Sequence, residues 1–270
     1  MSTSYEQFSN RIRRHCLHMA HIGESGHIGS MLSCVDLMVV LYGGNVLRFR
    51  PDDPKWIDRD RFIMSKGHAG AAVYAVLTEH GFFPNEWMDT YYQDNGKLMG
   101  HISHYVPGVE YSTGSLGHGL SVCCGMALAA KEKNKHHRIF CMLSDGDCNE
   151  GSTWEAIMFA GQEKLDNIIT IVDYNKIQAL GFVKDIIDLG NIGKKISDFG
   201  WAVKEINGHD HQEIERTLMQ VPFENGKPSF IVAHTVKGKG VSFLENTVAS
   251  HYAKITDQML EDALKELGDK

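Results

Sequence analysis

The chain has 270 residues, of which 43% are hydrophobic and 23% are charged. These values predict an ordinary globular protein with a core that needs no disulfide bonds. The 27 Lys and Arg against 34 Asp and Glu give a net charge of −7, which argues against nucleic-acid binding. No apolar run is long enough to cross a membrane and residues 1–7 have no apolar signal core, so we expect a cytoplasmic protein with reduced cysteines.

Helical and β-branched segments alternate along the chain. Apolar spacing first predicts a strand over Arg61–Ser65 and helices over Tyr5–His21, with Phe8, Ile12, Cys16 and Met19 on one stripe, Ser33–Tyr42 and Ala71–His80. The later strands are expected over Ile139–Ser144, Ile168–Asp173, Ala202–Ile206 and Phe230–His234. The later helices are expected over Leu120–Glu132, Thr153–Lys164, Ile192–Phe199, His211–Met219 and Asp257–Leu267.

This alternation indicates the fold class. Continuous apolar strands such as Ile168–Asp173 are typical of a parallel sheet that is buried on both faces. Strands separated by one helix form right-handed crossovers. We therefore expect residues 1–270 to form a single doubly wound α/β domain with helices on both faces of a mostly parallel sheet. Ligands of such domains bind beyond the carboxyl ends of the strands.

An acidic turn follows one of these strands. Asp145-Gly146-Asp147 comes directly after Ile139–Ser144, and Ser152 with Glu155 predicts a capping box at the next helix. Asn175 ends the next strand, thirty residues after Asp145. If the two strands are neighbours, a carboxylate and an amide oxygen converge beside a helix N-terminus, which suits a metal-bridged diphosphate. A polar turn with no ligand is the alternative interpretation of the same spacing.

These residues resemble the fingerprint of thiamin diphosphate enzymes, in which Gly-Asp-Gly precedes Asn by about thirty residues. The rest of the chain resembles the cofactor-binding N-terminal part of transketolases, in the family's order. The matching segments are Gly26–Gly29, Ser65–Ala69, Gly100-His101, Ser112–Gly119 and Lys237-Gly238-Lys239-Gly240 to His251. Departures are Ser144 in place of the first Gly, Ile28 where Pro is common, His118 in place of Gln, and Tyr252-Ala253-Lys254 after His251.

The resemblance implies a cofactor site. Mg²⁺, or Ca²⁺ or Mn²⁺ in its place, would be bound by Asp145, by the side chain of Asn175 and by the backbone carbonyl of Ile177. Thiamin diphosphate would be contacted by Ser30, His68, Gly114, Ser115, Leu116, Asp145, Gly146, Asn175, Lys237 and His251. Gly146 would let the backbone approach the diphosphate.

The resemblance also implies catalytic roles. His27 and His101 would face the substrate, stabilising oxyanions and moving protons at sugar hydroxyls, and His251 would touch both diphosphate and substrate. Glu150 resembles the buried carboxylate near the contact between two active sites. A zinc site at His101 and His104 is a weaker alternative, because no third ligand has conventional spacing. His209-Asp210-His211 is expected to begin a helix at the surface.

A full transketolase is more than twice as long. The resemblance therefore implies that the pyrimidine-binding and C-terminal domains reside on a partner chain, in an α2β2 assembly that transfers a two-carbon ketol unit between sugars or sugar phosphates. Two other assignments stay open. One is the diphosphate-binding subunit of a 2-oxo-acid dehydrogenase or decarboxylase, or of an enzyme like deoxyxylulose-phosphate synthase. The other is a cofactor-binding scaffold without catalysis.

Overall fold

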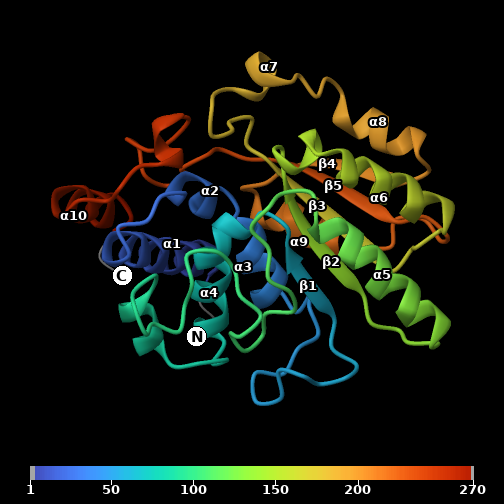
Figure 1. Ribbon diagram of the computed structural model, residues 1–270, viewed down its shortest axis with the longest axis horizontal. Coiled ribbons are helices and arrows are strands. Elements are labelled where there is room, and N and C mark those ends of the chain that lie inside the picture. Colours follow the sequence, from blue (N-terminus) through green and yellow to red (C-terminus); the bar gives the residue numbers. More distant parts are fainter. Residues whose placement is uncertain (1–3, 269–270) are drawn as a thin grey trace.

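The computed structural model describes residues 4–268 and contains a five-stranded sheet in the order β1-β2-β3-β5-β4. All neighbouring strands are parallel (Figure 1). The strands are β1 (Arg61–Met64), β2 (Ile139–Ser144), β3 (Ile168–Tyr174), β4 (Ala202–Asn207) and β5 (Ser229–His234). The predicted strands are confirmed, with ends that differ by a single residue at most.

The crossovers decide which face each helix covers. The chain passes from β2 to β3 through α6 (Gly151–Gln162) and from β3 to the edge strand β4 through α8 (Ile192–Asp198). It then returns to β5 through α9 (His211–Leu218). Right-handed crossovers that run in opposite directions place their helices on opposite faces. Accordingly, Ile157 of α6 and Ile196 of α8 pack in one apolar cluster, and Ile214 of α9 packs in the other.

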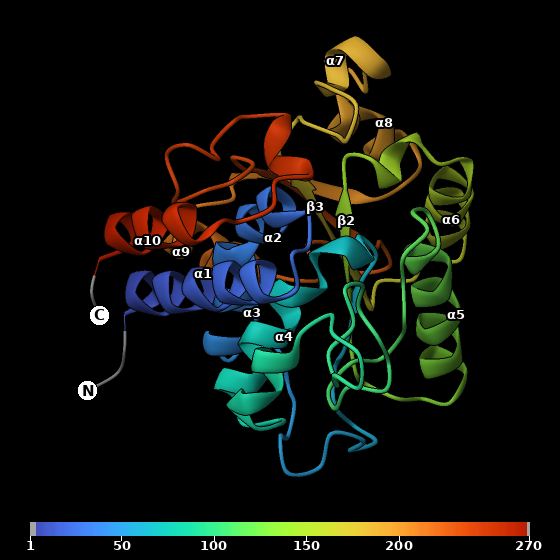
Figure 2. The ribbon, with the colours of Figure 1, turned by 60° about the vertical axis from the view of Figure 1, so that its left-hand side comes forward.

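The sheet is buried on both sides, as its apolar strands require. In β2, Ile139, Cys141 and Leu143 face the cluster beneath α5 (Gly119–Glu132), α6 and α8. Phe140 and Met142 face the opposite cluster. That second face is covered by α1 (Tyr5–Ile22), α3 (Val35–Gly43), α4 (Gly70–Glu79) and α9. Figure 2 shows the two helical layers on either side of the sheet and confirms the doubly wound α/β fold.

The first helix follows its predicted stripe. Ile12, Cys16 and Met19 of α1 are fully buried, and Phe8 is half-buried. A short, fully buried helix, α2 (Ile28–Ser33), was not predicted. Its six residues are too few to show a helical period, and it follows His27, whose φ of 71° is left-handed.

The remaining helices surround the carboxyl edge of the sheet and the outer layer. They are α7 (Val183–Ile186), α10 (Asp257–Glu266) and short 3₁₀ turns over Gly67–Ala69, Asn85–Thr90, Asp147–Asn149 and Ala249–His251. The predicted capping box is wrong: Glu150 is the N-cap of α6, and the Ser152 hydroxyl donates to the Gly117 carbonyl at 2.9 Å. All six cysteines are free and buried, as expected. No helix within residues 4–268 is long and apolar enough to span a membrane.

Candidate active site

The ends of four neighbouring strands converge at one edge of the sheet. Lys66 lies just beyond β1, Asp145 beyond β2, Asn175 beyond β3 and Lys237 beyond β5. Register places Ser144 beside Asp173. Because the strands are parallel, these segments emerge on the same side, where a doubly wound domain binds its ligands. The predicted convergence of Asp145 and Asn175 is therefore confirmed.

A cavity of about 140 Å³ opens among these segments. Its predicted lining residues are Ser30, His68, Leu116, Asp145, Gly146, Asn175, Ile177 and His251, and the sequence gave no indication of Ser144, Gln178 and Ala179. The volume equals that of about five water molecules, at roughly 30 Å³ each. A cavity of this size and polarity suits the diphosphate of a coenzyme rather than the whole coenzyme.

Asp145 carries the negative charge of this cavity. Its side chain is 2% exposed and accepts from the backbone amides of Gly146 at 3.0 Å and Lys176 at 2.7 Å. Burial, together with the charge of Asp173, raises the pKa of Asp145 to about 7. A cation bound at this carboxylate would stabilise its ionised form.

Asn175 and Ile177 present the other oxygen ligands. The Asn175 amide nitrogen donates to Asp173 at 3.3 Å, so its oxygen is the free end, and this oxygen accepts from the Ile177 amide at 3.1 Å. Amide and carbonyl oxygens each have two lone pairs, so one remains on each for a ligand. One carboxylate with two neutral oxygens is a donor set that fits a hard divalent cation.

The histidine-rich alternative lacks comparable support. Within the described range 4–268, no group of three or more His, Cys, Asp or Glu side chains could hold a metal ion. His104 instead forms a hydrogen bond with the Ser112 hydroxyl at 2.7 Å through Nδ1. The structure thus gives His101 and His104 no zinc-binding geometry.

Asp173, which was not predicted, joins the strand ends beneath the cavity. It accepts hydrogen bonds from Ser33, at 2.5 Å, from Thr235 and from the Lys66 ammonium group, which also donates to the Ser30 carbonyl at 2.8 Å. Lys66 and Asp173 are both fully buried. Although burial opposes ionisation, Lys66 holds the pKa of Asp173 below its usual range. The signals were present: Lys66 lies in the matching Ser65–Ala69 segment, and Asp173 precedes Asn175 by two residues.

Four predicted histidines gather at the mouth of the cavity, around His27. The centre of its ring lies 5.1 Å from that of His68, 5.6 Å from His101 and 4.9 Å from His251. Burial, followed by the charges of His101 and Lys237, lowers the pKa of His27 to about 4. Burial and the Lys237 charge lower the pKa of His251 to about 3. At neutral pH both rings are uncharged and able to accept a proton.

Lys237 lies behind the cavity wall. Its fully buried ammonium group donates to the Ile177 carbonyl at 3.0 Å and to Nδ1 of His251 at 2.9 Å. Burial lowers its pKa to about 8. Lys237 therefore connects a proposed metal ligand to one of the histidines.

The loop that carries Gly114 and Ser115 lies beside the histidines. Both residues are exposed and do not line the 140 Å³ cavity, unlike Leu116. A Cβ atom built on Gly114 would lie 3.6 Å from Cδ2 of His101. The loop is held by Asp147, another residue that was not predicted, which accepts from the amide of Gly117 at 2.9 Å and the hydroxyl of Ser65 at 2.6 Å.

Glu150 does not match its expected burial. Its side chain is exposed in this chain, at the N-cap of α6. The turn before it also differs from the expected phosphate-binding helix end. The amides of Cys148, Asn149 and Glu150 donate to carbonyls within the turn, so they are already paired.

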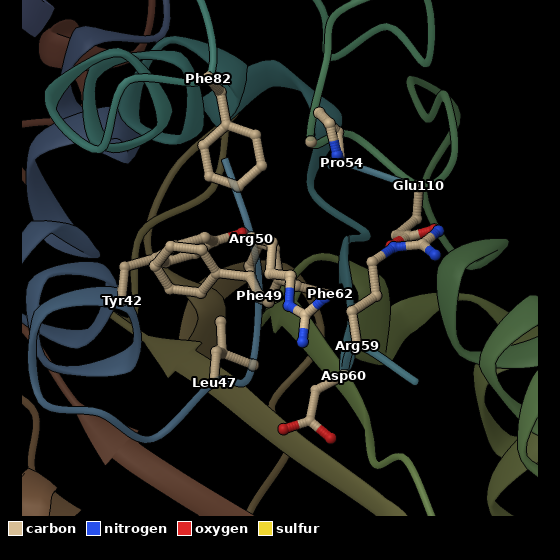
Figure 3. Close-up of a pocket in the computed structure, with 11 residues that line it drawn as sticks. Tyr42, Leu47, Phe49, Arg50, Pro54, Arg59, Asp60, Phe62, Phe82 and Glu110 are labelled. Carbon is tan, nitrogen blue, oxygen red and sulfur yellow. The ribbon is translucent and has the colours of Figure 1, made fainter. Parts of the chain in front are cut away.

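A separate hollow lies at the opposite edge of the sheet, before β1 (Figure 3). Its volume is about 20 Å³, enough for about one water molecule. Its charged groups are paired: Arg59 binds Glu110 at 2.7 Å, and Asp60 accepts from Arg48 and Arg138. These ion pairs give the hollow a structural role and leave the carboxyl edge as the candidate active site.

Comparison with known proteins agrees with this location. Residues 4–270 match the family model described as transketolase, thiamine diphosphate binding domain. The chain belongs to the transketolase family. The transketolase structure from Campylobacter jejuni superposes with a TM-score of 0.93 at 34% identity, over 99% of this chain and 43% of that one.

Relatives of subunit length are also found. One of the two subunits of an apulose-4-phosphate transketolase from Phocaeicola vulgatus is 38% identical over 97% of this chain and 93% of its own length. A 6-deoxy-6-sulfo-D-fructose transketolase subunit of a Clostridium species is 40% identical over 96% of this chain and 94% of its own. The mouse transketolase is 34% identical, but this chain spans only 41% of it. The chain is thus similar to subunits of transketolases as well as to the N-terminal part of longer enzymes.

Proposed function

We propose that this chain is the diphosphate-binding subunit of a split transketolase. It would transfer a two-carbon ketol unit from a ketose or ketose phosphate to an aldose or aldose phosphate. The observation that supports this most directly is the cavity at the strand ends, where Asp145, Asn175 and Ile177 present oxygens beneath four clustered histidines.

The cofactor would be thiamin diphosphate with Mg²⁺. When bound, it supplies the carbanion chemistry that breaks and forms the carbon–carbon bond. Asp145, Asn175 and Ile177 would hold the metal, while Ser30, His68 and Gly146 would contact the diphosphate. This division fits the small polar cavity of about 140 Å³.

The histidines would handle the protons of the sugar. His27 and His251 are neutral at physiological pH because burial lowers the pKa of both rings. Each could accept a proton from a sugar hydroxyl and return it later in the reaction. His101, which is exposed beside His27, would bind the substrate from the open side.

A partner chain would complete the active site. The chain spans 41% of the mouse transketolase and 43% of the Campylobacter jejuni chain, so the rest of those enzymes has no counterpart in these residues. We expect the partner to carry the pyrimidine-binding domain in an α2β2 assembly, and Glu150 to become buried there. The two subunit-length relatives are named for different sugars, so the particular donor sugar is left open.

Variants of the histidines separate this proposal from its alternatives. In the assembled enzyme, His27→Ala and His101→Ala should each lower kcat by about 10²–10⁴-fold, the usual contribution of acid–base groups. The dissociation constant for thiamin diphosphate should change little. Unchanged turnover in both variants would contradict the sugar-transfer role and favour an oxo-acid enzyme or a scaffold.

A further inference from the structure

The segment His209-Asp210-His211 has a role beyond beginning a helix. Asp210 caps α9, accepting from the amides of Gln212 and Glu213 at 3.0 Å each, as the predicted helix start requires. The expected surface location is wrong for the two histidines, however. Both rings turn inward to the carboxylate of Asp36 on α3, which is 3% exposed.

Asp36 is the anionic centre of a buried cluster. It accepts from Nδ1 of His209 at 2.7 Å, from Nε2 of His211 at 3.0 Å and from the Arg13 guanidinium group at 2.7 Å. Although burial opposes ionisation, these donors hold the pKa of Asp36 well below its usual range. The charged cluster therefore fixes α1, α3 and α9 to one another.

The two histidines differ on their far sides. Nε2 of His209 accepts the backbone amide proton of Val236 at 2.8 Å. An accepting ring nitrogen carries no proton, so the proton of His209 lies on Nδ1, where it is donated to Asp36. The hydrogen bonds of His211, in contrast, go to Asp36 and to the hydroxyl of Ser9.

Val236 directly precedes Lys237. On the other side of Lys237, the Arg13 guanidinium group donates through Nε to the carbonyl of Lys239 at 3.0 Å. The Asp36 cluster thus holds the backbone on both sides of Lys237. The ammonium group of that lysine meets Ile177 and His251 at the cavity wall.

We propose that His209 is a positioning residue, which fixes the backbone before Lys237 and so places its ammonium group against Ile177 and His251. The inference rests on the proposed function, which gives that cavity its diphosphate ligand. His209 does not itself touch the cavity. It acts as the link between the Asp36 cluster and the β5 strand end.

The chain offers a matched pair of variants. His209→Phe and His211→Phe each remove one hydrogen bond to Asp36, but only the first removes the acceptor for the Val236 amide. His209→Gln keeps an amide oxygen at a similar reach. Each variant of the full chain is measured by hydrogen–deuterium exchange at Val236, by thermal melting, and by calorimetric titration with thiamin diphosphate and Mg²⁺.

We expect His209→Phe to accelerate exchange at Val236 and to weaken thiamin diphosphate binding about 10–100-fold, the usual effect of losing a supporting contact of a ligand shell. His211→Phe should melt similarly but bind within about twofold of wild type, and His209→Gln should recover most of the affinity. Equal weakening by both Phe variants, or unchanged Val236 exchange in His209→Phe, would overturn the inference alone. A wild-type chain that does not bind thiamin diphosphate would overturn the proposed cofactor site as well.

Discussion

At the scale of single residues, the protonation of His27 follows directly from its surroundings. Burial and the charges of His101 and Lys237 lower its pKa from 6.5 to about 4. We therefore predict that the ring is neutral throughout the physiological range. Histidine-selective NMR over pH 3–8 should show a midpoint near 4 for the resonance that is absent from His27→Gln. A midpoint above 6 would contradict the environment described for this ring.

The same shift has a consequence for stability. The unfolded chain binds a proton at His27 near pH 6.5, whereas the folded chain does so only near pH 4. Stability from this group is therefore present in full above pH 6.5 and is lost as the pH falls from 6.5 to about 4. Denaturant unfolding of His27→Gln should show a smaller loss over that interval than wild type.

Lys66 supports the cavity from below. Lys66→Met would leave Asp173 buried without its cation, and removing one partner of a buried pair costs about 3–5 kcal/mol of unfolding free energy. Lys194→Met is the control, because the Lys194–Asp198 pair is exposed and should contribute less than about 0.5 kcal/mol. Urea unfolding at pH 7 measures both. Similar losses in the two variants would show that Lys66 is not a stabilising partner of Asp173.

Residue by residue, the sequence predicted the cavity better than its supports. Eight lining residues were predicted because they follow strands or lie in segments that resemble a known family. Asp173, Asp147 and His209 were missed, since a buried polar group is recognised by partners that lie far away in sequence. The Asp36–His209 contact, for example, joins residues 173 positions apart. Spacing along the chain contains no signal for such contacts.

At the scale of elements, α5 depends on a glycine where it approaches β1. A Cβ atom on Gly119, the first residue of α5, would lie 2.5 Å from Cβ of Ser65, closer than real Cβ atoms come. Gly125 in the same helix has open space around its Cβ position. The two glycines therefore offer the same substitution in opposite environments.

We predict that Gly119→Ala is destabilising, since the loop after β1 must shift, and that it also weakens thiamin diphosphate binding. Gly125→Ala should stabilise the chain by about 0.5–1 kcal/mol, because Ala loses less entropy in a helix interior. Thermal melting and cofactor titration of both variants provide the measurement. A Gly119→Ala variant at least as stable as Gly125→Ala would contradict the close packing.

The elements show why local pattern succeeds in some places only. Long segments such as α1 and continuous apolar strands such as β3 have a clear period, and their bounds were predicted closely. The short helix α2 and the turn at Asp147–Asn149 are set by tertiary contacts: residues of α2 touch Asp173 and Lys66, and Asp147 binds Ser65. These are the segments that shape the site.

At the scale of the whole molecule, the fold presents half of a catalytic centre. The cavity suits a diphosphate, the histidines face outward from it, and Glu150 is exposed at the nearby N-cap of α6. This arrangement leaves the distal part of a coenzyme and the bound sugar to be enclosed by another surface. The proposed partner chain would supply that surface.

The most direct measurement is a ketol-transfer assay with thiamin diphosphate, Mg²⁺, a ketose phosphate donor and an aldose phosphate acceptor. It is run on this chain alone, on the chain carrying the pyrimidine-binding half, on their mixture, and on a mixture with Asp145→Asn. We predict turnover only in the wild-type mixture. Turnover by this chain alone, undiminished turnover with Asp145→Asn, or none in any arm would contradict a split transketolase whose cofactor is held at the carboxyl edge of this sheet.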